Sequence, residues 1–373
     1  MSLTTERTLL TSKDDAIKTV QFFRLKHPAQ LAAFKALLTA HPAIQVYDTI
    51  RQQLKELIKT RHPGERLSDP ILEEKIAIQL GSGPAEEYGV WVYYPWSQRM
   101  VHLLDEAEFV ELRTSRNQHK ITAAEMQQLA HKKIGIIGLS VGQSAALTIA
   151  IERLCGEIRI ADFDTLDLSN LNRIRAGAYN IGLLKTTIVA REIAEIDPFL
   201  QVTCFDAGIT EDNIDTFLTE NGRLDVLVEE CDSMEIKILS RQRARAAQIP
   251  VIMETSDRGM MDIERFDLQP DRPLLHGKVQ DNLSYSSIRT FSGEERMQLV
   301  RDILDFDNIS DKLRSSIAEI GKTITTWPQL ASAVALGGAM AAHVCREICL
   351  ERPIASGRYY ADPDLVFNHS STH

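Results

Sequence analysis

Short apolar runs alternate with longer amphipathic stretches between residues 132 and 254. The runs have the length of buried strands and cover Lys133–Ile137, Glu157–Ala161, Gln201–Phe205, Asp225–Glu229 and Pro250–Glu254. Between them, apolar residues recur at helical spacing in Gln143–Arg153, Leu184–Ile196, Glu211–Thr219 and Met234–Ala247. Connections of this length join parallel strands. The pattern therefore predicts an α/β fold with a mostly parallel sheet and helices on both faces.

The alternation loosens after Glu254. Met261–Leu268 reads as one further strand, antiparallel to the others, because the preceding connection is too short for a crossover helix. A helix rich in Ala and Gly is predicted over Gln329–Leu350, and it ends before Pro353. Its small side chains favour close packing against a neighbour.

The first 110 residues have a different pattern of apolar residues, without regular alternation of strands and helices. Helical spacing of apolar residues marks Leu31–Leu38 and Ile50–Ile58, and Tyr88–Tyr94 is rich in strand-forming residues. A turn at Pro95 would return the chain through Met100–Leu104 as a hairpin. We therefore expect a smaller N-terminal helical or α+β domain over 1–110, for holding a peptide or for dimerisation, and a second domain over 111–373.

The amino-acid composition argues against several classes of binding partner. The 373 residues include 42 Lys and Arg against 52 Asp and Glu, so the net charge is −10, which argues against nucleic acid or an anionic membrane surface. The N-terminal segment is too polar for a secretory signal, and no apolar run reaches the length that spans a bilayer. Five scattered cysteines without a CxxC pair favour a reducing cytoplasm and argue against structural zinc.

A glycine turn follows the first strand of the α/β region. Gly138, Ser140 and Gly142 stand between that strand and a helix, and two motifs compete for them. As G-x-S-x-G they would form the nucleophile elbow of a serine hydrolase, with His276 as the reasonable downstream histidine. As a shortened G-x-G-x-x-G they would let a phosphate approach the helix N-terminus. A tight packing turn without chemistry is the third possibility.

The position of this turn favours the nucleotide loop. A turn after the first strand is where a Rossmann-like fold binds its nucleotide, whereas an elbow serine normally follows several strands of its own sheet. About 20 residues further on, the second strand ends in Asp162, the acidic residue that a ribose hydroxyl pair requires at this spacing.

The segment that follows carries a specific resemblance. Asp162–Arg173 reads DFDTLDLSNLNR and is followed by GLLK ending at Lys185, which is similar to the signature of the ThiF/MoeB family, the adenylating enzymes related to ubiquitin-activating enzymes. Glu230-Cys231-Asp232 resembles the family's strand-end aspartate, and Arg113–Asn117 resembles its R-Y-x-R-Q segment. The final helix, after Trp327-Pro328, also matches. The resemblance covers about residues 110–350.

The resemblance implies ATP and Mg as cofactors and gives a role to each matched residue. Nucleotide contacts would come from Gly138, Ser140, Gly142, Asp162, Asp164, Asn170, Arg173 and Lys185, with Asp162 on the ribose and Asn170 near phosphate. Arg173 and Lys185 would lie on the triphosphate, and Asp232 would hold Mg. Arg116 would reach the phosphates across a homodimer interface. Arg173, Lys185, Asp232 and Arg116 are thus the expected catalytic set.

Elementary chemistry supports these assignments. Attack of a carboxylate on the α-phosphate brings two anions together, so positive charge must be placed to neutralise them. Each residue alone has a simpler reading: Arg173 or Lys185 as a solvated charge, and Asp232 as the cap of the following helix. Their joint spacing favours the nucleotide site.

The chain departs from the family pattern at several positions. Ser140 replaces a glycine in a shortened loop, Ile174 stands where glutamine is common, and the paired CxxC zinc motifs are missing. Cys345 and Cys349 have helical spacing and are read as packed side chains rather than metal ligands. No cysteine lies between Glu254 and Gly321, where a carrier thiol would be expected, and strand-end Cys231 is the alternative nucleophile.

Together these features predict ATP- and Mg-dependent activation, by adenylation or phosphorylation, of a carboxylate on a peptide or small protein. The 110-residue extension resembles relatives that modify peptide antibiotic precursors such as those of microcin C or pantocin A, with amide formation or cyclising dehydration as the outcome. The segment from Glu254 to Gly259 would then line the acceptor site, or serve only as a strand-end loop. Alternatives are activation of a ubiquitin-like sulfur carrier, the Ser140 hydrolase and a non-catalytic nucleotide-binding protein.

Overall fold

The computed structural model describes residues 18–368. The chain divides into two compact units, residues 1–123 and 124–373. Each unit has its own sheet and its own hydrophobic clusters, and each is described by itself.

The first unit is built on a four-stranded sheet with strand order β1-β3-β4-β2. Its strands are β1 (Gln21–Phe23), β2 (Gln45–Asp48), β3 (Val90–Tyr94) and β4 (Arg99–Leu103). Its helices are α1 (Pro28–Ala40), α2 (Ile50–Arg61), α3 (Asp69–Leu80), α4 (Glu106–Arg113) and the short 3₁₀ turns η2 (Ala85–Glu87) and η3 (Ser115–Asn117). The predicted hairpin is confirmed, because β3 and β4 pair antiparallel.

Two clusters of buried side chains hold the first unit together. One lies between α2, α3 and the end of β4 and includes Leu54, Ile76 and Leu104. The other lies beneath α1 and includes Trp91 and Met100. Helices α1 and α2 pack into these clusters through apolar residues at three- and four-residue spacing. This amphipathic pattern is the reason that both helices could be predicted from the sequence.

The second unit is built on a seven-stranded sheet with strand order β11-β10-β9-β8-β5-β6-β7. The strands are β5 (Lys133–Ile137), β6 (Glu157–Ala161), β7 (Gln201–Phe205), β8 (Val226–Glu229), β9 (Val251–Thr255), β10 (Met260–Glu264) and β11 (Gly357–Tyr360). The five strands from β5 to β9 are parallel, and β10 and β11 join antiparallel. The predicted α/β fold with a mostly parallel sheet is confirmed.

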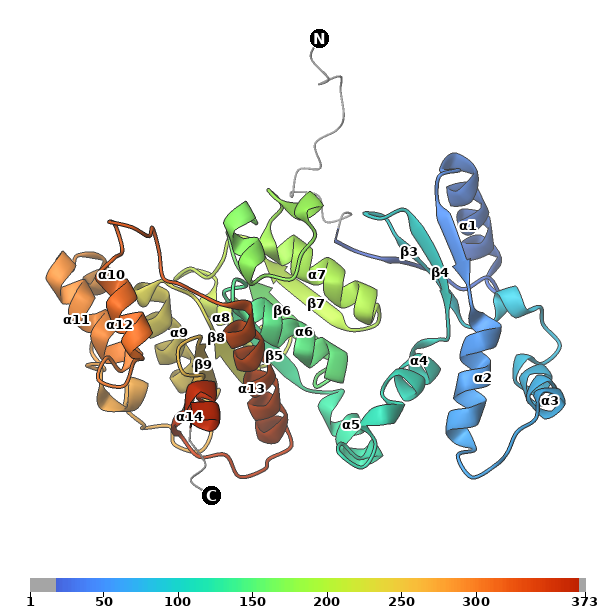
Figure 1. Ribbon diagram of the computed structural model, residues 1–373. Coiled ribbons are helices and arrows are strands. Elements are labelled where there is room, and N and C mark those ends of the chain that lie inside the picture. Colours follow the sequence, from blue (N-terminus) through green and yellow to red (C-terminus); the bar gives the residue numbers. More distant parts are fainter. Residues whose placement is uncertain (1–17, 369–373) are drawn as a thin grey trace, which may run out of the picture. The chain divides into compact units, whose positions relative to one another are not determined.

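Helices cover both faces of this sheet (Figure 1). Three of them, α6, α7 and α13, pack on one face, and α8 and α9 pack on the other. The helices of the unit are α5 (Ala123–Leu129), α6 (Gly142–Glu152), α7 (Lys185–Ile196), α8 (Ile214–Thr219), α9 (Met234–Ala246), α10 (Tyr285–Arg289), α11 (Gly293–Leu304), α12 (Asp311–Ile317), α13 (Ala331–Cys349) and α14 (Pro363–Asn368), with 3₁₀ turns η4 (Leu168–Asn172), η5 (Ala178–Asn180) and η6 (Leu274–Gly277).

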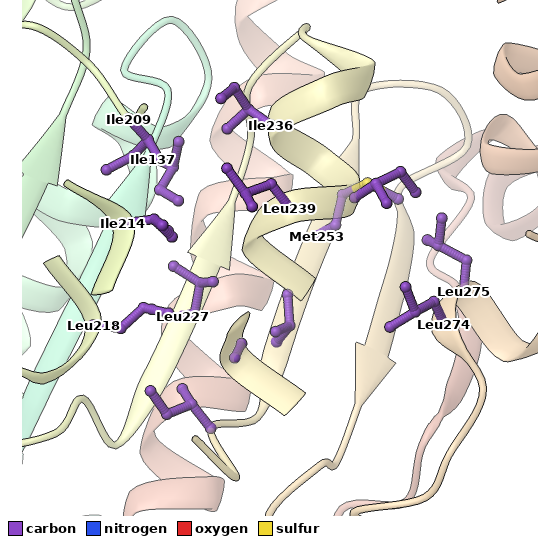
Figure 2. Close-up of a cluster of buried hydrophobic side chains, with 14 of the residues drawn as sticks. Ile137, Ile209, Ile214, Leu218, Leu227, Ile236, Leu239, Met253, Leu274 and Leu275 are labelled. Atoms are coloured by element: carbon purple, nitrogen blue, oxygen red, sulfur yellow. The ribbon is translucent and has the colours of Figure 1, made fainter. Parts of the chain in front are cut away.

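The core on the α8–α9 face joins the central strands to the chain after β10. Figure 2 shows Leu227 of β8 and Met253 of β9 facing Ile236 and Leu239 of α9. Leu274 and Leu275 extend the same cluster beyond β10. The segment after β10, for which we predicted no helix before Gln329, is thus held to the sheet by apolar burial.

Three predicted boundaries are wrong for local reasons. Helix α8 begins at Ile214 rather than Glu211, because the Asn213 side chain accepts the Thr210 N–H and bonds Gly208 O in a turn. Strand β10 ends at Glu264 rather than Leu268, since the chain turns at Arg265. Helix α13 runs over Ala331–Cys349, two residues later than predicted at its start.

A chain of buried ion pairs crosses the unit beneath the sheet edge. The fully buried Arg241 guanidinium donates to Glu229 at 2.5 Å and to Glu264 at 2.7 Å. The Lys237 ammonium bonds both carboxylate oxygens of Glu229, at 3.1 and 3.2 Å. Buried charges of this kind are tolerated only when they are paired, which fixes the orientation of Lys237.

Residues 18–368 contain no helix that combines the length and the apolar character needed to cross a bilayer.

Candidate nucleotide and substrate site

The glycine turn lies where the strand order of the second unit reverses. Strands β6 and β8 flank β5 on opposite sides, so the crevice at the carboxyl ends of β5 and β8 is the topological switch point of the sheet. Gly138 has φ +86°, and a Cβ there would lie 2.7 Å from the carbonyl of Glu230. Only glycine allows this approach of the β5 turn to the end of β8. Helix α6 then begins at Gly142, and its N-cap, Val141, provides no side-chain cap.

Asp162 braces the turn from the end of β6. One oxygen of its carboxylate accepts the backbone N–H of Leu139 at 2.7 Å, and the other accepts that of Asp164 at 2.8 Å. Burial raises the pKa of Asp162, and the nearby Lys185 opposes this effect. The acid predicted to meet a ribose therefore also fixes the shape of the loop.

Lys185 and Asn170 take part in local hydrogen bonds. The buried Lys185 ammonium donates to Asp164 at 2.8 Å, and the Asp164 carboxylate is half exposed. The Asn170 side chain accepts the Asp167 N–H and closes a reciprocal capping box on η4. The predicted segment is thus an ordered loop that places these polar groups after β6.

Arg173 points from the end of η4 toward the glycine turn. Its guanidinium donates to Ser140 Oγ at 2.9 and 3.1 Å and to Asn172 Oδ1 at 2.9 Å, all uncharged acceptors. Burial lowers the pKa of Arg173, opposed by the charge of Asp232. A partly buried guanidinium bonded only to neutral oxygens is suited to receive an anion.

The same contacts bear on the hydrolase alternative. Ser140 Oγ is bonded to an arginine, while the two ring nitrogens of His276 contact Asp262 at 3.0 Å and Arg272 at 2.7 Å. A serine nucleophile needs a histidine on its hydroxyl. The structure does not form the pair that the hydrolase requires.

Asp232 follows β8 with an exposed side chain. The cap of α9 is the next residue, Ser233, whose hydroxyl accepts the Ile236 N–H at 3.2 Å. The reading of Asp232 as a helix cap is therefore wrong. Within residues 18–368, no three His, Cys, Asp or Glu side chains are grouped as a metal centre.

A cavity of about 400 Å³ opens beside Arg173 and Asp232. These are the two predicted nucleotide or metal residues that line it. The full lining is Val141, Arg173, Glu230, Cys231, Asp232, Met234, Lys237, Met253, Glu254, Thr255, Ser256, Asp257, Arg296, Val300, Leu304, Leu313, Thr326, Trp327, Pro328 and Gln329. Asn172 Nδ2 donates to the Gln329 carbonyl at 2.8 Å, so the segment around Trp327 is tied to the residue next to Arg173.

Glu230 and Glu254 also line this cavity, together with Thr255, Ser256 and Asp257 of the segment expected at an acceptor site, but we did not predict the two glutamates as a pair from the sequence. Glu230 and Glu254 end adjacent parallel strands, and Glu230 accepts the Glu254 backbone N–H at 2.9 Å. Both carboxyl oxygens of Glu254 are buried without a hydrogen-bond partner among the described residues. Burial raises the pKa of Glu254 to about 8, and burial together with Glu254 raises that of Glu230. Acids at consecutive strand ends were the sequence signal that could have found the pair.

The cysteines are held as thiols. Cys231 Sγ donates to Glu229 at 2.9 Å, and burial together with Glu229 raises the pKa of its thiol well above the usual range. This environment disfavours a thiolate nucleophile. Cys345 and Cys349 are buried side chains of α13, as their spacing predicted.

Arg116 belongs to the first unit, where its side chain is exposed on η3. Arg113 ends α4, with its guanidinium 5.9 Å from the Phe109 ring centroid. Their part in catalysis and in a dimer stays a prediction.

Fold and site together define a Rossmann-like α/β protein with a glycine turn, strand-end acids and a partly buried arginine at the switch point of its sheet. The sequence pattern of the ThiF family matches residues 114–325. The chain belongs to the ThiF family, the adenylating family that the sequence motifs indicated.

Individual relatives differ in extent. The chain is 42% identical over 277 residues to the uncharacterized protein MT1398 of Mycobacterium tuberculosis, which covers 74% of this chain and 38% of that protein. It is 21% identical over 248 residues to the tRNA threonylcarbamoyladenosine dehydratase of Bacillus subtilis, covering 64% and 96%. The crystal structure of E. coli MccB with MccA-N7isoASN aligns with a TM-score of 0.48 at 14% identity, covering 82% and 83%.

Proposed function

We propose that this protein is an ATP- and Mg-dependent enzyme of the adenylyltransferase-like kind that activates a carboxylate on a peptide or small protein. The observation that carries the proposal is that Arg173 and Asp232 line one cavity beside the glycine turn that Asp162 braces, and that within residues 18–368 the side-chain hydrogen bonds of Arg173 go to the neutral oxygens of Ser140 and Asn172. Membership of the ThiF family supports it.

The residues present fit a nucleotide and its metal. The N-terminus of α6 offers backbone N–H groups to phosphate, and Arg173 adds positive charge beside them. Lys185 would serve the triphosphate after exchanging Asp164 for phosphate oxygens. Asp232 offers one exposed carboxylate, which suits Mg because this ion typically takes one or two carboxylates and completes its shell with phosphate and water. When bound, Mg would neutralise developing phosphate charge.

The chain's own groups would then position the attack. Arg173 would hold the α-phosphate and the incoming carboxylate together, replacing water with a fixed donor. Displacement of pyrophosphate leaves an acyl adenylate. An amine or internal amide nitrogen would then attack its acyl carbon, with release of AMP and loss of the N–H proton, to form an amide or a ring. Amide formation from such an adenylate needs no carrier cysteine, in agreement with the buried thiol of Cys231.

We place the peptide-holding role in the N-terminal unit. All four residues of β2 are exposed, and within residues 18–368 β2 pairs with β4 alone, which makes it an edge strand of the described sheet. An open edge strand can pair with an extended peptide. Antibiotic-type peptide modification is the context we favour, with a homodimer in which Arg116 completes the partner's site.

The test measures ATP-dependent release of pyrophosphate with candidate precursor peptides and with a ubiquitin-like protein ending in Gly-Gly. We expect turnover with the peptide, and a loss of about 100-fold or more in Arg173→Ala and Asp232→Ala, since each removes a charge that the transition state needs. Ser140→Ala should lose far less. Full loss in Ser140→Ala with normal rates in the other two variants would overturn the proposal.

A further inference from the structure

The 400 Å³ cavity extends away from the predicted nucleotide residues. Gly138, Asp162, Asn170 and Lys185 do not line it, whereas Arg173 and Asp232 do. The cavity therefore includes the two residues expected near the reacting phosphate and the metal, and otherwise is lined by residues that the motifs do not assign to the nucleotide. The side chains that line the cavity therefore indicate which kind of substrate group is attached next to the activated carboxylate.

The far wall of the cavity is apolar. It is formed by Met234 of α9, Val300 and Leu304 of α11, Leu313 of α12, and Trp327 with Pro328. Met234, Val300, Leu304, Leu313 and Trp327 are all only half-buried. Apolar side chains left half-buried in a cavity gain stability when an apolar group covers them.

The charged groups deeper in the cavity are already compensated. Lys237 is paired with Glu229 at 3.1 Å, and Arg296 with Glu235 at 2.9 Å. The Asp257 carboxylate accepts the N–H and the O–H of Ser310, at 2.8 and 2.5 Å.

The two glutamates add no free charge to bind a ligand. Glu230 accepts the backbone N–H of Glu254. The pKa of Glu254, raised to about 8 by burial, keeps that carboxyl uncharged at neutral pH. Apart from Arg173 and Asp232, the charged side chains named above are thus engaged in ion pairs or hydrogen bonds within the protein, and the apolar wall is the surface left for a ligand to cover.

We infer that this cavity receives the side chain next to the activated carboxylate, and that the substrate carries a large uncharged apolar group there, aromatic or long aliphatic. Trp327 is then a specificity-determining residue, because its ring can stack on an aromatic side chain. The inference rests on the proposed function and adds the class of substrate.

The experiment uses the fluorescence of Trp327 in the full-length protein with ATP and Mg. N-acetyl-L-phenylalanine, N-acetyl-L-leucine, N-acetylglycine and N-acetyl-L-aspartate serve as probe carboxylates, and Trp327→Phe identifies which part of the signal comes from this residue. We expect the phenylalanine and leucine probes to bind at least about tenfold more tightly than the glycine probe, the effect of burying one large apolar side chain.

A matched pair of variants on α11 tests the wall directly. Val300→Asp places a charge in the cavity, whereas Met297→Asp places the same charge on the exposed side of the helix. The preference should be lost in Val300→Asp and kept in Met297→Asp, with circular dichroism confirming that both fold.

Equal affinity for the glycine and phenylalanine probes, or no binding of the phenylalanine probe, would overturn the inference. ATP binding, measured separately by equilibrium dialysis, tests the proposed function. If the protein binds ATP but does not prefer the phenylalanine and leucine probes, the inferred substrate class is wrong and the proposed function stands. If it prefers these probes but does not bind ATP, the proposed function is wrong and the apolar cavity stands.

Discussion

At the scale of single residues, the site combines groups that the motifs reveal with groups that only packing reveals. The positions of Asp162 and Asp232 were predictable because both follow strand ends, which parallel strands bring to one edge of the sheet, and Arg173 was identified from its place in the family motif. The buried, unpaired carboxyl of Glu254 could not be predicted, because its burial depends on packing against α13, which lies far away in the sequence.

Glu254 should make stability fall as the pH rises. Its folded pKa of about 8 lies above the ordinary value of 4.5, so between these values the folded state holds a proton that the unfolded state has released. The contribution of Glu254 to the free energy of unfolding is therefore greatest below about pH 4.5. It falls by on the order of a few kcal/mol as the pH rises to 8. Urea unfolding of Glu254→Gln at pH 5.5 and 8.5 should show a smaller loss than the wild type. The exposed Glu211→Gln is the control, and an identical pH dependence in all three proteins would contradict the assignment.

At the scale of elements, the main strands and long helices could be predicted from hydrophobic periodicity. Strands β5, β6, β8 and β9 are buried apolar runs, edge strand β7 is half-buried, and α6, α7 and α9 each bury apolar residues against the sheet. Several other helices and strands were not predicted from the sequence. We predicted none of β1, β2, α3 and α10–α12. Most of these are short, but α11 has apolar residues at helical spacing after a Ser292/Glu295 capping box and could have been found from the sequence. The antiparallel pairing of β10 was predicted correctly, whereas β11, from beyond α13, needed tertiary contacts to be found.

The contact between α6 and α13 makes a prediction about helix packing. A Cβ at Gly338 would lie 2.3 Å from Ser144 Oγ and 2.7 Å from the Ser144 backbone, so the two helices meet almost backbone to backbone. Gly338→Ala should destabilise the protein by about 2 kcal/mol through overpacking, although alanine is the better helix former by about 1 kcal/mol. Ala339→Gly on the exposed face should cost about 1 kcal/mol from propensity alone. Chemical denaturation measures both, and a stabilising Gly338→Ala would show that the helices can move apart.

At the scale of the whole molecule, the two units have separate sheets and separate cores. The predicted nucleotide residues Asp162, Arg173, Lys185 and Asp232 all lie in the second unit. A ligand bound only by folded protein stabilises the part that binds it.

Calorimetry should therefore show two transitions, and only one should respond to ATP with Mg. At a ligand concentration of about 100 times Kd, the stabilisation is about 2.7 kcal/mol, which raises the Tm of a unit of this size by a few degrees. Arg173→Ala should abolish the shift and leave the other transition unchanged. A single transition that moves as a whole would indicate that the units unfold together.

The cavity and the nucleotide residues share only Arg173 and Asp232. If the cavity receives the substrate side chain as we infer, substitutions on α11 should alter which carboxylate is accepted without touching the groups expected to hold ATP, whereas the segment around Trp327 is tied to Asn172 beside Arg173. Such a separation lets mutation explore new substrates while the energy-supplying step is conserved. Relatives in this family should accordingly diverge fastest along the wall opposite Arg173, and that wall is where a directed-evolution library would be placed.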